Sequence, residues 1–208
     1  MKHINPKKFY FTVLLLSVFL SSILAYSDNT KKNISDSVLR LHIIANSNSD
    51  ADQSLKLKVR DRIILDAGEL FSNTKSAENA VLEVIRHMEF LENSARDELL
   101  KNGSSSDVNI EVGEFFFPQK RYGGLFLPAG NYNAVRVILG EGKGKNWWCV
   151  MFPPLCFTRG VLEIPDDSDA YLKDNLSKGE YALITDETMP KVELRFKILD
   201  LLSSRKKD

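Results

Sequence analysis

The stretch from Asn131 to Phe157 (NYNAVRVILGEGKGKNWWCVMFPPLCF) constrains the fold most, and it holds both cysteines and both tryptophans of the chain. Residues 134–139 are mostly apolar and β-branched, which predicts a strand, and residues 147–152 predict a second strand rich in aromatics. The glycines between these segments supply the backbone freedom of a tight connection, so we expect a hairpin. The second strand should end at the Pro-Pro pair at 153–154, because proline cannot donate to a β-ladder.

The first 27 residues predict a signal peptide or a membrane anchor. Three lysines, at positions 2, 7 and 8, precede an apolar run of 17 residues, Phe9–Ala25. A charged segment followed by such a run is typical of export signals, and 17 residues is also the lower limit for a spanning helix. Ala25 and Ser27 resemble a cleavage site, so cleavage after Ser27 and retention as an anchor both stay open. The lysines would remain in the cytoplasm and the rest of the chain would lie outside.

Export would determine the oxidation state expected for the two cysteines. In an oxidising compartment an isolated pair is most simply a disulfide, so we predict a bond between Cys149 and Cys156. A ring this short gains on the order of 2 kcal/mol from loop closure. A zinc site is disfavoured, because two cysteines without nearby histidines supply too few ligands. A catalytic thiol with His42 or His87 as its base remains an alternative.

The composition is that of a folded domain with appendages. The 208 residues are 43% apolar and 27% charged, which excludes wholesale disorder. Without residues 1–27 the chain has 25 basic and 28 acidic residues, a net charge of −3. A mildly acidic domain has no electrostatic basis for binding nucleic acid, so we expect no nucleic-acid partner.

The pattern along the chain predicts an α+β fold. Apolar residues alternate in the expected strands and recur at helical spacing in the expected helices. We expect a mixed or antiparallel sheet packed against two long helices, plus a C-terminal helix. The predicted strands outside the opening stretch are 38–46 and 108–117, and the predicted helices are 55–71, 76–101 and 191–203. The predicted regions are a polar linker at 28–37, an α+β core domain at 38–165, and an acidic turn region with a C-terminal amphipathic helix at 166–208.

No catalytic motif is evident in the sequence. The GEGKG loop lacks the Lys-Ser/Thr and the helix of a P-loop, and a strand follows it instead of the helix of a dinucleotide fingerprint. Three histidines, one of them in the leader, leave little for acid–base work. Arg40 and His42 would share one half-polar face of a strand, which we interpret as a sheet face partly covered by a helix. We therefore expect a binding or signalling protein that is not an enzyme and has no metal, cofactor or small-molecule substrate.

Two segments carry a resemblance to a known family. They are LRLHIIANSNSDADQSLKLKVRD (39–61) and PAGNYNAVRVILGEGKGKNWWCVMFPPLCF (128–157). Together with the leader they resemble stage II sporulation protein R of endospore-forming bacteria, and NWWCV-x-FPPLCF is a distinctive signature. The resemblance covers roughly residues 38–160, and the region beyond about Asp166 carries none of it.

The resemblance implies a signalling role. Members of that family are exported from the forespore into the space between the forespore and mother-cell membranes. There they trigger a membrane-embedded aspartic protease, which removes the pro-sequence of the mother-cell factor pro-sigma-E. The chain would thus couple forespore to mother-cell gene expression by binding the protease. The N-terminal segment would contact the membrane if it is not cleaved.

Five residues are candidates for the contact with that protease. Aromatic and apolar anchors dominate interface energy, which suggests Trp147, Trp148, Phe152 and Leu155, with Arg136 as a secondary candidate. The competing interpretation, which we favour, is that the aromatics build the core beneath the glycine loop. The rival function classes are a cell-envelope thiol enzyme and a peptidoglycan-binding module.

Overall fold

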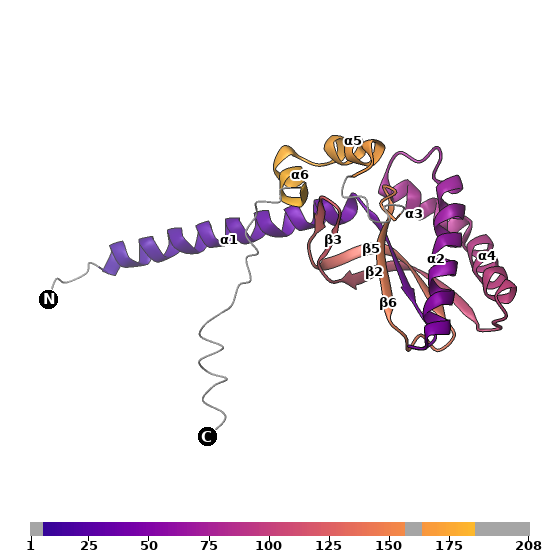
Figure 1. Ribbon diagram of the computed structural model, residues 1–208. Coiled ribbons are helices and arrows are strands. Elements are labelled where there is room, and N and C mark those ends of the chain that lie inside the picture. Colours follow the sequence, from indigo (N-terminus) through magenta and orange to yellow (C-terminus); the bar gives the residue numbers. More distant parts are fainter. Residues whose placement is uncertain (1–5, 157–163, 186–208) are drawn as a thin grey trace, which may run out of the picture.

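The fold joins a long N-terminal helix to an α+β domain (Figure 1). The computed structural model describes residues 6–156 and 164–185. In chain order the elements are α1 (Pro6–Asp36), β1 (Leu39–Ile44), α2 (Asp50–Leu70), α3 (Ala77–Arg86), α4 (Met88–Lys101), β2 (Val108–Phe117), β3 (Lys120–Tyr122), β4 (Leu125–Leu127), β5 (Gly130–Leu139), β6 (Asn146–Phe152), α5 (Asp166–Asn175) and α6 (Lys178–Thr185).

The main sheet is mixed and has the strand order β2-β5-β1-β6. Strand β1 lies parallel to β5 and antiparallel to β6, while β2 lies antiparallel to β5. Strands β3 and β4 form a separate antiparallel pair. This architecture confirms the predicted α+β class, with a mixed sheet.

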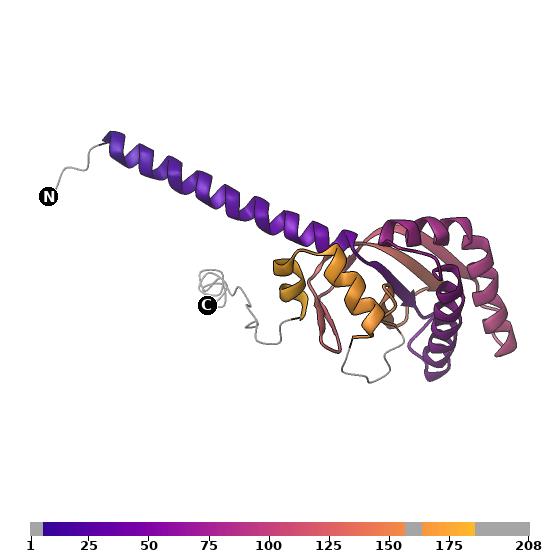
Figure 2. The same ribbon diagram turned by 90° about the horizontal axis from the view of Figure 1, so that it is seen from above.

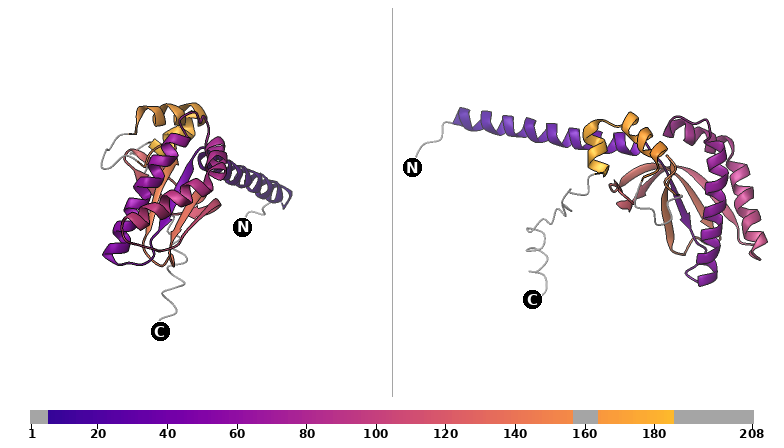
Figure 3. Two further views of the ribbon diagram at one scale, coloured as in Figure 1. Left: turned by 90° about the vertical axis from the view of Figure 1, so that its right-hand side faces the viewer. Right: turned by 45° about the horizontal axis from the view of Figure 1, so that its top comes forward.

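Helices α2, α3 and α4 cover one face of the sheet, and the left panel of Figure 3 shows α2 and α4 in front of the strands. Leu39, Leu41 and Ile43 of β1 point into this layer and are fully buried. They pack in one cluster with Val59 and Ile63 of α2. The alternation along β1 therefore forms the main core, as the period of two in a strand requires.

The opposite face is covered over only part of its length. A second cluster there joins Ile34 of α1, Phe117 of β2 and Leu172 of α5, and the small β3–β4 sheet contributes Leu125 and Leu127. Figure 2 shows α5 and α6 beside the domain end of α1. The rest of this face has no described helix over it (Figure 1).

The predicted hairpin between 134–139 and 147–152 is wrong. Strand β1 lies between β5 and β6, so the loop after β5 crosses the end of β1. The loop runs against residues 45–47: the N–H of Gly144 donates to the carbonyl of Ala45 (2.8 Å). A Cβ at Gly144 would lie 2.2 Å from the carbonyl oxygen of Ser47. The glycines therefore allow a close crossing of backbone rather than a two-strand turn.

Residues 28–36 continue α1 and do not form the predicted linker. Thr30 and Ile34 are buried, with Ile34 only 3% exposed. The side-chain amide of Asn33 donates to Glu180 of α6 (2.8 Å). No glycine or proline interrupts residues 7–37, so the helix can run from the apolar segment straight into the domain.

The apolar part of α1 behaves as the sequence predicts. Within the described residues, Tyr10–Asp36 is a helix long and apolar enough to cross a membrane, and none of its most apolar window is buried in the domain. This fits a signal or anchor segment. Because α1 is continuous, the apolar run and the first core strand are joined by a helix of fixed length.

Two further expectations are wrong, and a third concerns residues outside the described ranges. The single helix expected at 76–101 is broken at His87, whose backbone departs from helical angles (φ −112°, ψ 19°) and separates α3 from α4. The acidic turn expected after Pro165 is instead the first turn of α5, where acidic side chains favour the helix N-terminus. The helix expected at 191–203 lies outside the described residues.

The packing of α1 against the domain yields a stability prediction. Replacing Ile34→Ala should lower the free energy of unfolding by about 2–5 kcal/mol, because it leaves a cavity in the second cluster. Lys32→Ala, on the same helical segment but exposed, should change it by less than about 0.5 kcal/mol. Urea unfolding of the full chain in detergent measures both. Equal effects of the two substitutions would contradict the docking of α1.

Candidate functional site

The cysteine prediction agrees with the geometry: Cys149 and Cys156 form a disulfide, with their Cα atoms 5.5 Å apart. Cys149 points into the main core and is 2% exposed. The chain folds back after Phe152, so that the N–H of Leu155 donates to the carbonyl of Val150 (3.2 Å). The disulfide loop thus closes part of the outer edge of β6.

Two of the five contact candidates are buried, and a third, Trp147, is half-buried against the helix layer. Phe152 and Leu155 are buried, one in each of the two clusters. Trp147 packs against the main core on the helix side, where the guanidinium of Arg60 lies 4.3 Å from its ring centroid. These positions suit scaffold residues. This agrees with the core interpretation for these three.

Trp148 points to the opposite face and lies in an aromatic stack. Its ring lies 3.7 Å from that of His42 with 14° between the planes, and 4.7 Å from Phe117 in an edge arrangement. The His42 Nε2 atom is hydrogen-bonded to the side-chain oxygen of Asn146 (2.8 Å). Burial lowers the pKa of His42, and the nearby charge of Arg136 also lowers it. The stack therefore holds a neutral imidazole beneath a partly exposed indole.

Arg136 lies on the same face as Trp148. Its guanidinium forms an ion pair with Glu111, with 2.8 Å between Nε and the carboxylate, and lies 4.2 Å from the Phe115 ring centroid. Strand register places Glu111 beside Arg136 and Arg136 beside His42. We call this surface the open face: Glu111, Phe115, Arg136, His42, Asn146 and Trp148. It brings together the two contact candidates that lie on the His42 face, Trp148 and Arg136.

Arg40 anchors the covered part of the same face. It is fully buried, donates to the hydroxyl of Tyr122 (2.6 Å), and has ring centroids of Phe117 and Tyr132 at 4.1 and 4.7 Å. Burial lowers the pKa of Arg40 and raises the pKa of Tyr132 to about 12. The half-polar face expected for β1 is therefore covered, by the β3–β4 sheet and aromatic rings rather than by a helix.

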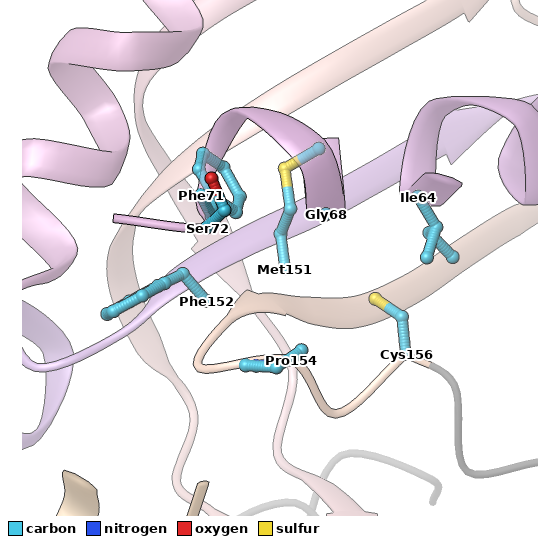
Figure 4. A pocket seen from close by; sticks show the side chains of 8 residues that line it. All are labelled: Ile64, Gly68, Phe71, Ser72, Met151, Phe152, Pro154 and Cys156. Carbon is cyan, nitrogen blue, oxygen red and sulfur yellow. The ribbon is translucent and has the colours of Figure 1, made fainter. Parts of the chain in front are cut away.

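A small apolar cavity lies beside the disulfide. It has a volume of about 220 Å³ and separates the C-terminal end of α2 from the end of β6 (Figure 4). Ile64 and Phe71 line the α2 side, while Met151 and Cys156 line the other. No charged side chain lines it, so its walls offer no acid, base or anion-binding group.

The geometry also bears on the thiol-enzyme alternative. His42 pairs with Trp148 in the register, one position from Leu41 and Cys149, so His42 and Cys149 project from opposite faces of the sheet. His87 lies in the α3–α4 turn, with its Nδ1 atom 2.9 Å from the carbonyl of Glu83. Neither histidine is placed as a base for a cysteine. The described residues also contain no cluster of three or more metal-binding side chains.

Comparison with known proteins decides the family. The profile described as Stage II sporulation protein R (spore_II_R) matches residues 35–161. This chain belongs to that family. It is 37% identical over 131 residues to the stage II sporulation protein R of Bacillus subtilis (strain 168). The aligned segment covers 63% of this chain and 58% of that relative. No solved structure matches the chain.

The family assignment confirms the resemblance seen in the sequence. The matched segment runs from the end of α1 through β6 and the disulfide loop, and so contains the whole main sheet. The open face lies entirely within it. Helices α5 and α6 and the apolar part of α1 lie outside it.

The burial of His42 predicts how stability depends on pH. Well above its ordinary pKa of 6.5 the ring is neutral in both states. As the pH falls below that value, the unfolded chain takes up a proton first, because the pKa of His42 is lowered in the folded protein, so the free energy of unfolding decreases. His42→Gln should flatten this dependence between pH 6.5 and 5 in urea unfolding. An unchanged slope would contradict the buried neutral ring.

The disulfide predicts the behaviour of the thiols. Protein isolated from an oxidising compartment without reductant should incorporate no maleimide, and should incorporate two per chain after reduction and unfolding. The Cys149→Ser, Cys156→Ser double variant should lose on the order of 2 kcal/mol of stability or somewhat more, because Cys149 is also a core residue. Full labelling of the native, unreduced chain would exclude the bond.

Proposed function

We propose that this protein is an exported sporulation signal that activates the membrane-embedded aspartic protease that processes pro-sigma-E. The observation that carries the proposal is membership of the stage II sporulation protein R family. In this role the chain leaves the forespore, acts in the intermembrane space and couples forespore to mother-cell gene expression. It is a ligand of the protease and not itself an enzyme.

The N-terminal helix supports this location. Lysines precede an exposed apolar helix, as in signal and anchor segments. The helix then continues to Asp36 and packs on the domain. The domain packs on α1 from about Tyr26 onward, directly after the apolar run, so an uncleaved chain would hold the domain close to the membrane surface. That position suits a partner embedded in the same membrane.

Activation requires that the ligand bind the active state of the protease more tightly than the inactive state. The open face is our candidate for that contact. It combines a partly exposed indole with an Arg–Glu pair, and tryptophan and arginine are the residues most often found at interface hot spots. The stack and the ion pair hold Trp148 and Arg136 in fixed positions, which lowers the entropy cost of binding.

A reconstitution experiment tests the proposal. The full chain is co-expressed with the membrane protease and pro-sigma-E, and processing is followed by the size shift of pro-sigma-E. We expect processing to require the chain, and a secretion-competent leader when the compartments are separated. Equal processing without the chain would refute the signalling role. Co-sedimentation with peptidoglycan in the absence of the protease would favour the wall-binding alternative.

The Arg136–Glu111 pair allows contact to be separated from folding. Arg136→Glu alone places two acids together and should reduce both stability and processing. Adding Glu111→Arg restores an ion pair in the reverse sense, so stability should return to within about 1 kcal/mol of the original. Processing should stay at least tenfold lower, about 1.4 kcal/mol of lost contact energy. Full activity of the double variant would remove this pair from the contact surface.

A further inference from the structure

Strand β2 is a long, regular edge strand. All ten of its residues pair with β5 in unbroken antiparallel register, and β5 is its one neighbour among the described strands. Edge strands are usually protected by a bulge, a lysine, a proline or a covering segment. The β2–β5 register contains no shift, and β2 contains neither lysine nor proline.

The register shows which backbone groups face outward. The N–H of Gly140 donates to the carbonyl of Asp107 (2.8 Å), so these two residues form a hydrogen-bonded pair. Alternation along an antiparallel ladder then turns the backbone groups of Asn109, Glu111 and Gly113 toward β5. The groups of Val108, Ile110, Val112, Glu114 and Phe116 point away from the sheet. No hydrogen bond joins them to another described residue.

The two edges of the sheet differ. At the β6 edge, the disulfide loop folds back and its Leu155 N–H occupies the carbonyl of Val150. At the β2 edge no described loop does the same. Phe116 also stands out from this edge strand with 66% of its surface exposed, more than any other large apolar side chain of the described α+β domain. The disulfide loop thus occupies part of the β6 edge, while the β2 edge is unpaired and is most exposed toward Glu114 and Phe116.

The charge of β2 indicates the kind of strand that would pair with it. Glu114 on this strand and Asp107 just before it are exposed acids, and the described residues place no ion-pair partner within 4 Å of either. Lys32 of α1 lies near enough to Glu114 to offset part of its charge, whereas no such neighbour is described for Asp107. Glu111 is neutralised by Arg136, and β2 itself carries no basic residue. A second copy would bring the same acids against this edge. A segment with lysine or arginine would offset them instead.

We propose that β2 accepts an extended, basic segment of the partner protein as a fifth strand of the sheet. Main-chain hydrogen bonds to the five outward residues would supply affinity, and the acids together with Phe116 would supply selectivity. This inference rests on the proposed function, because the partner is the protease named above. It adds the binding mode and the chemistry of the segment that binds.

Proline substitution at an outward position tests the edge. Glu114→Pro removes an outward N–H and leaves the bonds to β5 intact, as edge strands tolerate. Glu114→Gln is the matched control, because it removes the charge and keeps the N–H. In the processing assay we expect Glu114→Pro to lose at least tenfold and Glu114→Gln to lose a few-fold. Wild-type activity from Glu114→Pro would overturn the inference.

Hydrogen exchange provides a readout that does not depend on any variant. In the full chain, the outward amides of β2 should exchange much faster than those of Asn109, Glu111 and Gly113. Adding the detergent-solubilised protease should slow the outward amides at least tenfold. No change on binding would refute strand addition. Protection that grows with the concentration of the chain alone would instead assign the edge to a second copy.

The outcomes separate this inference from the proposed function. If the wild-type chain fails to activate processing, the signalling role fails. If the wild-type chain activates processing while Glu114→Pro is folded and equally active, the signalling role stands and the edge is excluded as its contact.

Discussion

The structure depends on strand β1 being bonded on both sides. Its parallel bonds to β5 and antiparallel bonds to β6 bring two distant parts of the chain together. One of its faces belongs to the main core, and the other contacts Phe117 of the second cluster. Leu41 and its neighbours hold the α2–α4 layer. Arg40 and His42, on the alternate positions, organise the aromatic rings that support the covered face and the open face. Removing β1 would therefore separate both the sheet and the two cores.

Much of this fold is predictable from the sequence, because amphipathic periodicity is a local signal. The strands at 39–44 and 108–117 and the helix at 50–70 follow from it directly. The predicted hairpin is wrong because strand pairing is not a local property. Nothing in residues 140–145 shows that β1, from an earlier part of the chain, will lie between β5 and β6. The predicted linker at 28–37 is wrong for a related reason. Polar composition alone does not show that Ile34 and Asn33 contact the domain.

The candidate site was predicted in part. Composition identifies the stretch that is rich in aromatic residues. It does not show that Trp148 lies beside His42 on one face of the sheet while Trp147 lies beside Arg60 on the other, because this depends on strand alternation and on the neighbouring elements. The open edge of β2 also cannot be predicted without the strand order, because the sequence of a ten-residue strand does not show whether it lies at the edge or in the middle of a sheet. The sequence predicts that a helix partly covers the face of Arg40 and His42, but the β3–β4 sheet and aromatic rings cover Arg40 instead.

The role we propose is that of a ligand and not a catalyst. The rigid α1 helix sets the position of the domain, the disulfide loop closes one sheet edge, and the open face and β2 remain available to a partner. Titration of purified full-length chain against a fixed amount of detergent-solubilised protease tests this claim most directly. A ligand predicts that the rate of pro-sigma-E processing rises with added chain and reaches a plateau at a fixed ratio to protease. Full activation by amounts far below that of the protease would indicate turnover, and would contradict the account.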